Sequence, residues 1–377
     1  MFYLKMYNKT LLNFGIEEDN LDGQKVVCLR EAKDFDNKLL PIGVAAEPES
    51  FMQWLRSRII PKNREYVDSF LAKNGLSHND TKGILKICKG LSLNDSYWIV
   101  ENEDEKFEDY NLYEHDFLKV LSLIAYTGYG SSPVKGFTSS PEFTTTGMLR
   151  KGWRRLGGKI LLYKGGTTGA ANAGNEPFSE FYASQIAARM ELNHVDYSLA
   201  MWKNCMCSVC ELFTDIDHSY VPIFRFVPNY SLRTVADYIK NLGENYYDEF
   251  VDMLVFDALI FNEDRHFGNF GLIVDNQTNR PCAFAPIFDN GSSLFNFAME
   301  DDIENLEEYA KTRSSSYGVP FENIVKEFIT SRQKAKLRKM IGFEFERNKS
   351  AKYNWPVKRM KAIEKYLQLR VSQLLEY

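Results

Sequence analysis

Apolar residues in the N-terminal third of the chain recur with the spacing of short helices. They predict helices over 51–60, which Pro61 ends, over 66–71, and after Asn79 or Asp80, either of which suits an N-cap. An apolar run at 97–100 predicts a strand. We therefore expect an accessory region over residues 1–127 that is mixed and mainly helical. Its residues form no pattern typical of a catalytic site.

From residue 128 the pattern changes to strands that alternate with longer helices. Gly, Ser, Pro and Thr dominate 128–140, which is typical of a connection between domains. We expect strands at 159–164 and 206–213, helices at 177–190 and 248–261, and a C-terminal helix whose buried face carries Met360, Ile363, Leu367, Val371 and Leu374. This mixture predicts an α+β fold with a helical C-terminal part.

The helix expected at 248–261 leads into a polar stretch with a distinctive spacing. The stretch reads Asn262-Glu263-Asp264-Arg265-His266-Phe267-Gly268-Asn269-Phe270, and an apolar strand and then Phe288-Asp289-Asn290 follow it. Phosphoryl transfer makes few covalent demands on a protein, because the rate comes from alignment and charge neutralisation. Oxygen-bearing side chains at these spacings are what such a reaction needs.

Four polar residues here have predicted roles. Asp264 would face the attacking hydroxyl as a general base, and Asn269 and Asp289 would hold Mg²⁺ through their oxygen atoms. His266 would support the loop by hydrogen bonding. The alternative is that these residues only cap a turn after a buried helix, where Asp and Asn are common.

The segment before this stretch has features of a nucleotide site. Thr146 and Gly147 precede Lys151, and backbone N–H groups of such a loop can approach phosphates. Lys164 ends an apolar strand and could reach the phosphates, with Glu180 as its ion-pair partner. Backbone groups at Glu211-Leu212-Phe213 would bind adenine. The alternatives are a plain hairpin tip and two unrelated surface charges.

The order Asp-x-His-x-x-Asn differs from that of eukaryotic protein kinases, where the histidine precedes the aspartate. Over roughly residues 130–300 the chain resembles the HipA-like serine/threonine kinases of bacteria. The matching residues are Gly147, Lys151, Lys164, Glu180-Phe181-Tyr182, Leu192-Asn193, Glu211-x-Phe213, Asp264, His266, Asn269 and Asp289. Leu149 stands where that family often has glutamine, and the N-terminal region differs from that of its best-known members.

The resemblance implies a bilobal protein-kinase-like fold, with an accessory region at 1–127, an N-lobe at 128–215 and a helical C-lobe at 216–377. It also implies ATP and Mg²⁺ as cofactors, a protein substrate with a Ser or Thr acceptor, and a toxin-like role in growth control with an antitoxin-type protein partner. Thr144 matches a loop serine that is autophosphorylated in the family. The alternatives are a phosphoinositide or small-molecule kinase, suggested by Asp264-Arg265-His266, and a catalytically idle nucleotide-binding scaffold.

Composition narrows the classes of partner. The 377 residues carry a net charge of −5, which argues against a large nucleic-acid interface. No signal peptide or membrane-spanning run is apparent, so we expect a cytoplasmic protein with no membrane partner. Cys205-x-Cys207-x-x-Cys210 resembles half of a zinc site, but the other three cysteines are scattered, which favours reduced core thiols.

Overall fold

The computed structural model describes residues 1–19, 23–130 and 140–377. The chain divides into two units. The first contains Met1–Lys164, Glu211–Val221 and Ile273–Cys282, and the second contains Gly165–Cys210, Pro222–Leu272 and Ala283–Tyr377. The division into 1–127, 128–215 and 216–377 stays a prediction. Most of the Gly-rich connection expected at 128–140 lies outside the described residues.

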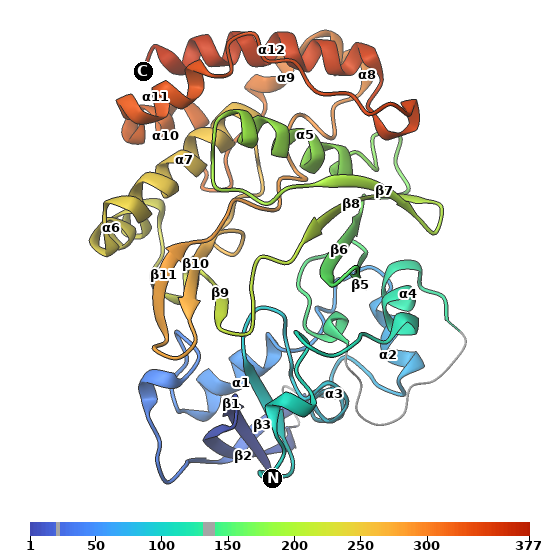
Figure 1. The fold of residues 1–377 in the computed structure, drawn as a ribbon, viewed down its shortest axis with the longest axis vertical. Helices are drawn as coiled ribbons and strands as arrows, with labels where there is room; N and C mark the ends of the chain where they lie inside the picture. Colours follow the sequence, from blue (N-terminus) through green and yellow to red (C-terminus); the bar gives the residue numbers. More distant parts are fainter. Residues whose placement is uncertain (20–22, 131–139) are drawn as a thin grey trace. The chain divides into compact units, whose positions relative to one another are not determined.

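An antiparallel sheet begins the first unit (Figure 1). Its strands β1 (Phe2–Met6), β2 (Lys9–Asp19), β3 (Gly23–Glu31) and β4 (Tyr97–Val100) lie in the order β3-β2-β1-β4. Leu4 pairs with Leu12 and with Ile99, and all three side chains are buried. Helix α1 (Pro48–Arg56) packs here through Phe51, whose ring centroid lies 4.8 Å from that of Phe14. The sequence pattern predicted only β4 among these strands.

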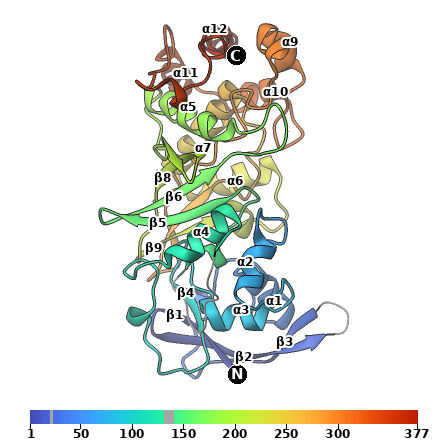
Figure 2. The same ribbon diagram turned by 90° about the vertical axis from the view of Figure 1, so that its right-hand side faces the viewer.

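Three further helices belong to the first unit: α2 (Val67–Lys73), α3 (Thr81–Cys88) and α4 (Lys119–Thr127). Figure 2 shows α1 and α3 on one side of the sheet that β1, β2 and β3 form. The Asp80 carboxylate accepts a hydrogen bond of 2.7 Å from the Gly83 N–H, so Asp80 rather than Asn79 is the N-cap of α3. The helices predicted at 51–60, 66–71 and after Asp80 are confirmed, although α1 ends before Ile59 and Ile60.

The first unit also contains a hairpin. It consists of β5 (Lys151–Leu156) and β6 (Lys159–Gly165), and its tip is Gly157-Gly158. Both glycines have positive φ values, 59° and 81°, a conformation that suits a two-residue hairpin turn. The strands β9 (His218–Pro222), β10 (Gly271–Asp275) and β11 (Arg280–Phe284), most of whose residues belong to this unit, form a sheet in the order β11-β10-β9. The short 3-10 helices of the unit are η1 (Asn37–Leu39), η2 (Phe107–Asp109) and η3 (Pro141–Phe143).

The second unit is mainly helical. It contains α5 (Glu176–Arg189), the hairpin of β7 (Ser198–Trp202) and β8 (Cys205–Glu211), η4 (Ile223–Arg225), α6 (Leu232–Leu242) and α7 (Glu244–Ile260). Every residue of α7 from Phe250 to its end is buried, so this helix runs through the core of the unit. Phe261 then takes a left-handed conformation with φ of 54° and ends the helix. The core helix thereby delivers the chain to the polar stretch at 262–270.

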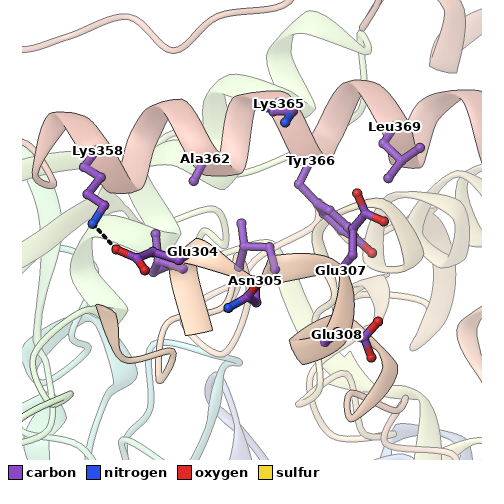
Figure 3. A pocket seen from close by; sticks show the side chains of 11 residues that line it. Glu304, Asn305, Glu307, Glu308, Lys358, Ala362, Lys365, Tyr366 and Leu369 are labelled. Carbon is purple, nitrogen blue, oxygen red and sulfur yellow. Dashed lines mark hydrogen bonds and ion pairs between the residues drawn. The ribbon is translucent and has the colours of Figure 1, made fainter. Parts of the chain in front are cut away.

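Five helices complete the C-terminal part of the second unit (Figure 1). They are α8 (Glu300–Glu304), α9 (Leu306–Lys311), α10 (Phe321–Phe328), α11 (Ser331–Arg338) and α12 (Val357–Leu375), with η5 (Ala351–Tyr353) before the last. Helices α10, α11 and α12 pack on α7, and α8 and α9 pack on α12. The predicted face of α12 is buried, which confirms the expected C-terminal helix. Figure 3 shows a cavity of about 490 Å³ between α8, α9 and α12, in which Lys358 pairs with Glu304. No residue of the predicted catalytic or nucleotide site lines it.

The described part of the chain contains neither a membrane-spanning helix nor a cluster of metal-binding side chains. None of its helices has the length and apolar character needed to span a bilayer. In the same residues, no group of three or more His, Cys, Asp and Glu side chains is arranged to hold a metal ion. Cys207 and Cys210 are buried thiols of β8, and neither forms a disulfide. Cys205, at the start of the same strand, is half-buried, and the reduced state of these thiols stays a prediction.

Candidate active site

Hydrogen bonds from the side chains and backbone of Asn262 and Asn269 hold the loop at 262–270 in shape. The Asn262 carboxamide accepts a hydrogen bond of 3.2 Å from the Asp264 N–H and donates one of 3.0 Å to Asp257 in α7. Asn269 donates from its backbone to the His266 carbonyl and from its side chain to the Asp264 carbonyl, both at 2.8 Å. Asp264 and His266 are exposed. The loop is therefore held in one shape while two of its predicted catalytic side chains face solvent.

Arg265 connects this loop to the segment around Asp289. Its side chain is only 1% exposed, and its guanidinium forms two hydrogen bonds with the Asp257 carboxylate, at 2.9 and 3.1 Å. Its third nitrogen, Nη1, donates to the carbonyls of Asn269 and Phe288, at 2.9 and 2.5 Å, and Nη2, which also binds Asp257, donates to the Asn290 side chain at 2.6 Å. One planar group thus fixes helix α7, the catalytic loop and both neighbours of Asp289.

Burial acts in opposite directions on the pKa values of Asp257 and Arg265. It acts to lower the pKa of Arg265, but the charge and hydrogen bonds of Asp257 outweigh it and raise that pKa. Burial raises the pKa of Asp257, against the charge and hydrogen bonds of Arg265. A buried charge is tolerated only when it is paired and hydrogen-bonded. Both conditions are met here, so the pair can serve as a fixed anchor for the loop.

Asp289 is held from its other side by the chain after α5. Its N–H donates to the Tyr197 hydroxyl at 3.1 Å, and the Ile287 backbone exchanges hydrogen bonds of 2.9 Å with Asn193 and Val195. Asp289 has a φ of 57°, a left-handed conformation that Asp adopts more readily than most residues. The backbone on both sides of Asp289 is therefore held by Arg265 and by the segment 193–197.

Asn269 and Asp289 fit a magnesium ion by their donor atoms. The Asn269 side-chain nitrogen is bonded to the Asp264 carbonyl, which leaves the amide oxygen as the atom for a cation. Asp289 adds a hard anionic oxygen, and Mg²⁺ in phosphoryl-transfer sites is typically bound by one or two such groups together with phosphates and waters. The same Arg265 nitrogen contacts the backbone of Asn269 and that of Phe288, next to Asp289.

His266 acts on the loop itself. Its Nδ1 accepts a hydrogen bond of 3.0 Å from the Gly268 N–H. A Cβ atom at Gly268 would lie 2.8 Å from the His266 ring, so this position accepts no side chain without a shift of the ring. Any part of His266 in the chemistry stays a prediction.

The predicted nucleotide loop lies in the first unit. Lys151 donates from Nζ to the Thr146 carbonyl at 3.0 Å, and it pairs with Lys164 in the register of β5 and β6. Gly147 has a φ of 91°, and a Cβ there would lie 2.2 Å from the Lys151 ammonium. Thr144 is only 5% exposed and donates to the Leu91 carbonyl at 2.8 Å. The loop residues therefore fold around one ammonium group.

Arg64 organises this loop and was not predicted from the sequence. Its guanidinium donates to the carbonyls of Glu142, Thr145 and Lys151 at 3.1, 3.2 and 2.8 Å. Burial lowers the pKa of Arg64 to about 10. At neutral pH the side chain therefore stays charged and donates to three backbone carbonyls of the loop.

The remaining predicted residues fall in both units. Lys164 and the segment 211–213 belong to the first unit, where the Leu212 N–H donates to the Ile160 carbonyl at 2.9 Å. The Glu211 side chain is half-exposed and pairs with Lys159 at 2.5 Å. Glu180 belongs to the second unit, where it is buried and accepts a hydrogen bond from the Ser208 hydroxyl. The Lys164–Glu180 ion pair and the adenine contact at 211–213 stay predictions.

Comparison with known proteins adds to this geometry. No protein-family model matches the chain. A 144-residue segment is 29% identical to the serine/threonine-protein kinase CtkA of Helicobacter pylori strain J99, which covers 34% of this chain and 43% of that protein. The chain thus matches less than half the length of this curated relative. The crystal structure of H. pylori CtkA aligns with 60% of this chain and 91% of that chain, at 18% identity and a TM-score of 0.48.

A second solved structure matches the whole chain. It is that of Shewanella oneidensis MR-1 HipA, solved with HipB and its operator DNA, and the two chains align over 100% of both, at 12% identity and a TM-score of 0.53. The chain has the HipA-like kinase fold. The predicted resemblance and the predicted α+β fold are thereby confirmed.

Within this HipA-like fold, sequence reasoning missed the residues that fix the loop. Asp257 stands in the run Val255-Phe256-Asp257-Ala258, where every neighbour is buried and apolar. A carboxylate in such a run needs a buried cationic partner. That pattern pointed to an arginine in the following loop, whereas nothing in the sequence indicated Tyr197 or Asn290 as supports of Asp289.

Proposed function

We propose that this protein is an ATP- and Mg²⁺-dependent serine/threonine protein kinase of the HipA-like type. The observation that carries the proposal is the Arg265 network, in which one buried guanidinium binds the backbone of Asn269 and both neighbours of Asp289. A turn that merely capped a helix would not need a buried charge to tie it to a residue more than twenty positions later. The similarity to CtkA supports the same activity.

The residues of the chain take distinct roles in this proposal. Asp264, exposed on a fixed loop, orients the acceptor hydroxyl and takes its proton, a role that contributes ~10²–10⁴ in rate. Asn269 and Asp289 hold Mg²⁺, which neutralises phosphate charge when bound. Lys151 and Lys164 bind phosphates, with Thr146 and Gly147 in the covering loop. Glu180 positions Lys164, and 211–213 bind adenine.

The proposal is tested by Asp264→Asn. This change keeps the shape of the side chain but removes the base, so we expect transfer from γ-labelled ATP to protein to be lost while nucleotide binding is kept. Asp301→Asn, the same change at an exposed position on α8, is the matched control and should leave transfer unchanged. Full transfer activity in Asp264→Asn would reject the assigned role.

The same transfer assay distinguishes a protein acceptor from a lipid acceptor. Label is followed separately in a protein extract and in phosphoinositide vesicles. Label that enters protein at Ser or Thr supports the proposal, and label that enters lipid instead would favour the phosphoinositide-kinase alternative. ATP binding without any transfer would favour the idle scaffold.

We also propose a cellular setting. The HipA of S. oneidensis was solved with HipB, and the shared fold supports an antitoxin-type protein as a partner of this chain in the cytoplasm. Autophosphorylation at Thr144 is part of the same proposal. Because its hydroxyl is buried against Leu91, the loop would have to open before phosphate could reach it.

A further inference from the structure

Aromatic side chains gather on the second unit beside the catalytic loop. The ring of Tyr230 lies 6.4 Å from that of Phe224 and 4.9 Å from that of Phe267, measured between centroids. Tyr317 lies 5.2 Å from Phe267 on the other side. Tyr230 is 50% exposed, and Phe224 and Phe267 are half-buried. We call Phe224, Tyr230 and Phe267 the aromatic shelf.

The aromatic shelf is fixed to the catalytic loop by the backbone. The Phe224 N–H donates to the Phe267 carbonyl at 3.3 Å, and the Ile223 N–H donates to the Phe270 carbonyl at 3.0 Å. A Cβ at Gly268 would lie 2.8 Å from the His266 ring and 4.0 Å from the Phe224 ring. The shelf is therefore continuous with His266, two residues after the exposed Asp264.

The exposure of the shelf is not required for folding. The rings of the core of this unit, such as those of Phe250 and Phe270, are 0% and 2% exposed, whereas Tyr230 keeps half of its surface in contact with solvent. One exposed ring beside two half-buried rings, all held by the backbone, offers a ligand a large contact area at a low entropic cost, which is typical of a binding site.

The charge beside the shelf selects among ligands. The Arg225 guanidinium lies 5.1 Å from the centroid of the Phe224 ring, so this ring already forms a cation–π contact. A second cation from a ligand would be repelled there, whereas an uncharged apolar side chain would bury surface against Tyr230 and Phe267. The shelf is thus built for an apolar or aromatic residue rather than for a basic one.

We propose that the aromatic shelf binds an apolar side chain of the acceptor protein, a few residues from the serine or threonine that receives phosphate. This inference rests on the proposed kinase function and names part of its substrate class. Asp264 holds the hydroxyl, and the shelf next to the same loop holds a neighbouring side chain. Acceptor segments with Leu, Ile, Met or Phe near the hydroxyl are therefore preferred over segments with Lys or Arg.

The test is a peptide library with a central Ser or Thr and one flanking position fixed at a time. Wild type should phosphorylate peptides with large apolar residues at one or two flanking positions about tenfold faster than those with Ala or Lys, as expected for one side chain in an apolar site. Tyr230→Ala should remove most of this selectivity, and Tyr230→Phe should keep it. Tyr129→Ala, at another exposed tyrosine, is the matched control.

The outcomes separate the two proposals. If wild type phosphorylates no protein and no peptide, the proposed function fails and this inference fails with it. If peptides are phosphorylated without apolar preference, or if Tyr230→Ala keeps the preference, only the shelf is overturned. A change in oligomeric state of Tyr230→Ala with unchanged selectivity also overturns it, since the shelf would then bind a second copy. Thermal melts of each variant establish that it is folded.

Discussion

The buried Asp257–Arg265 pair provides the sharpest test of how the site is held. Arg265→Met removes the guanidinium and leaves the Asp257 carboxylate in the core with, among the residues that the structure describes, the Asn262 amide as its remaining side-chain partner. Breaking such a pair from one side typically costs about 3–5 kcal/mol, because an uncompensated charge stays buried. We expect Arg265→Met and Asp257→Leu each to lower the free energy of unfolding by about this amount.

The double variant Asp257→Leu/Arg265→Met distinguishes stability from catalysis. With both charges replaced by apolar groups, most of the lost stability should return, because well-packed apolar replacements of buried ion pairs are often close to neutral. Phosphate transfer should not return, since the backbone of Asn269 and Phe288 still lacks its donor. Urea unfolding followed by circular dichroism and transfer from labelled ATP measure the two quantities.

A matched control is the partly exposed ion pair that Glu263 of the same loop forms. Arg313 pairs with Glu263 at 2.9 Å, and both side chains are about a quarter exposed. Arg313→Met should therefore cost no more than about 1 kcal/mol. The reasoning is refuted if Arg265→Met is as stable as Arg313→Met, or if the double variant regains transfer.

Four further predictions concern Gly268, Glu322 and Thr144. Gly268→Ala should reduce transfer while ATP binding is kept, because its Cβ displaces the His266 ring; unchanged steady-state rates would contradict this. Burial acts to raise the pKa of Glu322, but Arg370 outweighs it and lowers that pKa below 4.5. The ion pair should therefore stabilise the fold above pH 4.5 and weaken as the pH falls below it, so Glu322→Gln should reduce the loss of stability below pH 4.5 in acid unfolding curves. Thr144→Val should lower the free energy of unfolding by about 1 kcal/mol in thermal melts, because the hydrogen bond to the Leu91 carbonyl is lost. Phosphopeptide mapping of the wild type after incubation with ATP should find phosphate within residues 138–146. The absence of phosphate there would reject autophosphorylation.

The long helices were predicted well from the sequence, and the first β-sheet was predicted poorly. Helices α5, α7 and α12 have apolar faces or runs that extend over many residues, so their periodicity is clear. In β2 the residues Leu11, Leu12, Phe14 and Ile16 are all buried, and a register irregularity lies next to them in the pairing with β1. Strict alternation is thereby lost, and with it the signal by which a strand is recognised.

The spacing of the catalytic loop has a physical explanation that the sequence alone did not provide. Exposure alternates along it, with Asp264 exposed, Arg265 buried and His266 exposed. The residue between the aspartate and the histidine is thus the one that points into the core. A lysine there would offer one point charge, whereas the planar guanidinium of Arg265 reaches Asp257 and three acceptors of other segments at once. With an apolar partner in place of Asp257, an apolar residue would make an equally stable core, but it could not donate to the carbonyls of Asn269 and Phe288. The buried arginine therefore contributes geometry rather than stability, and the order Asp-Arg-His leaves Asp264 exposed for the role that we propose.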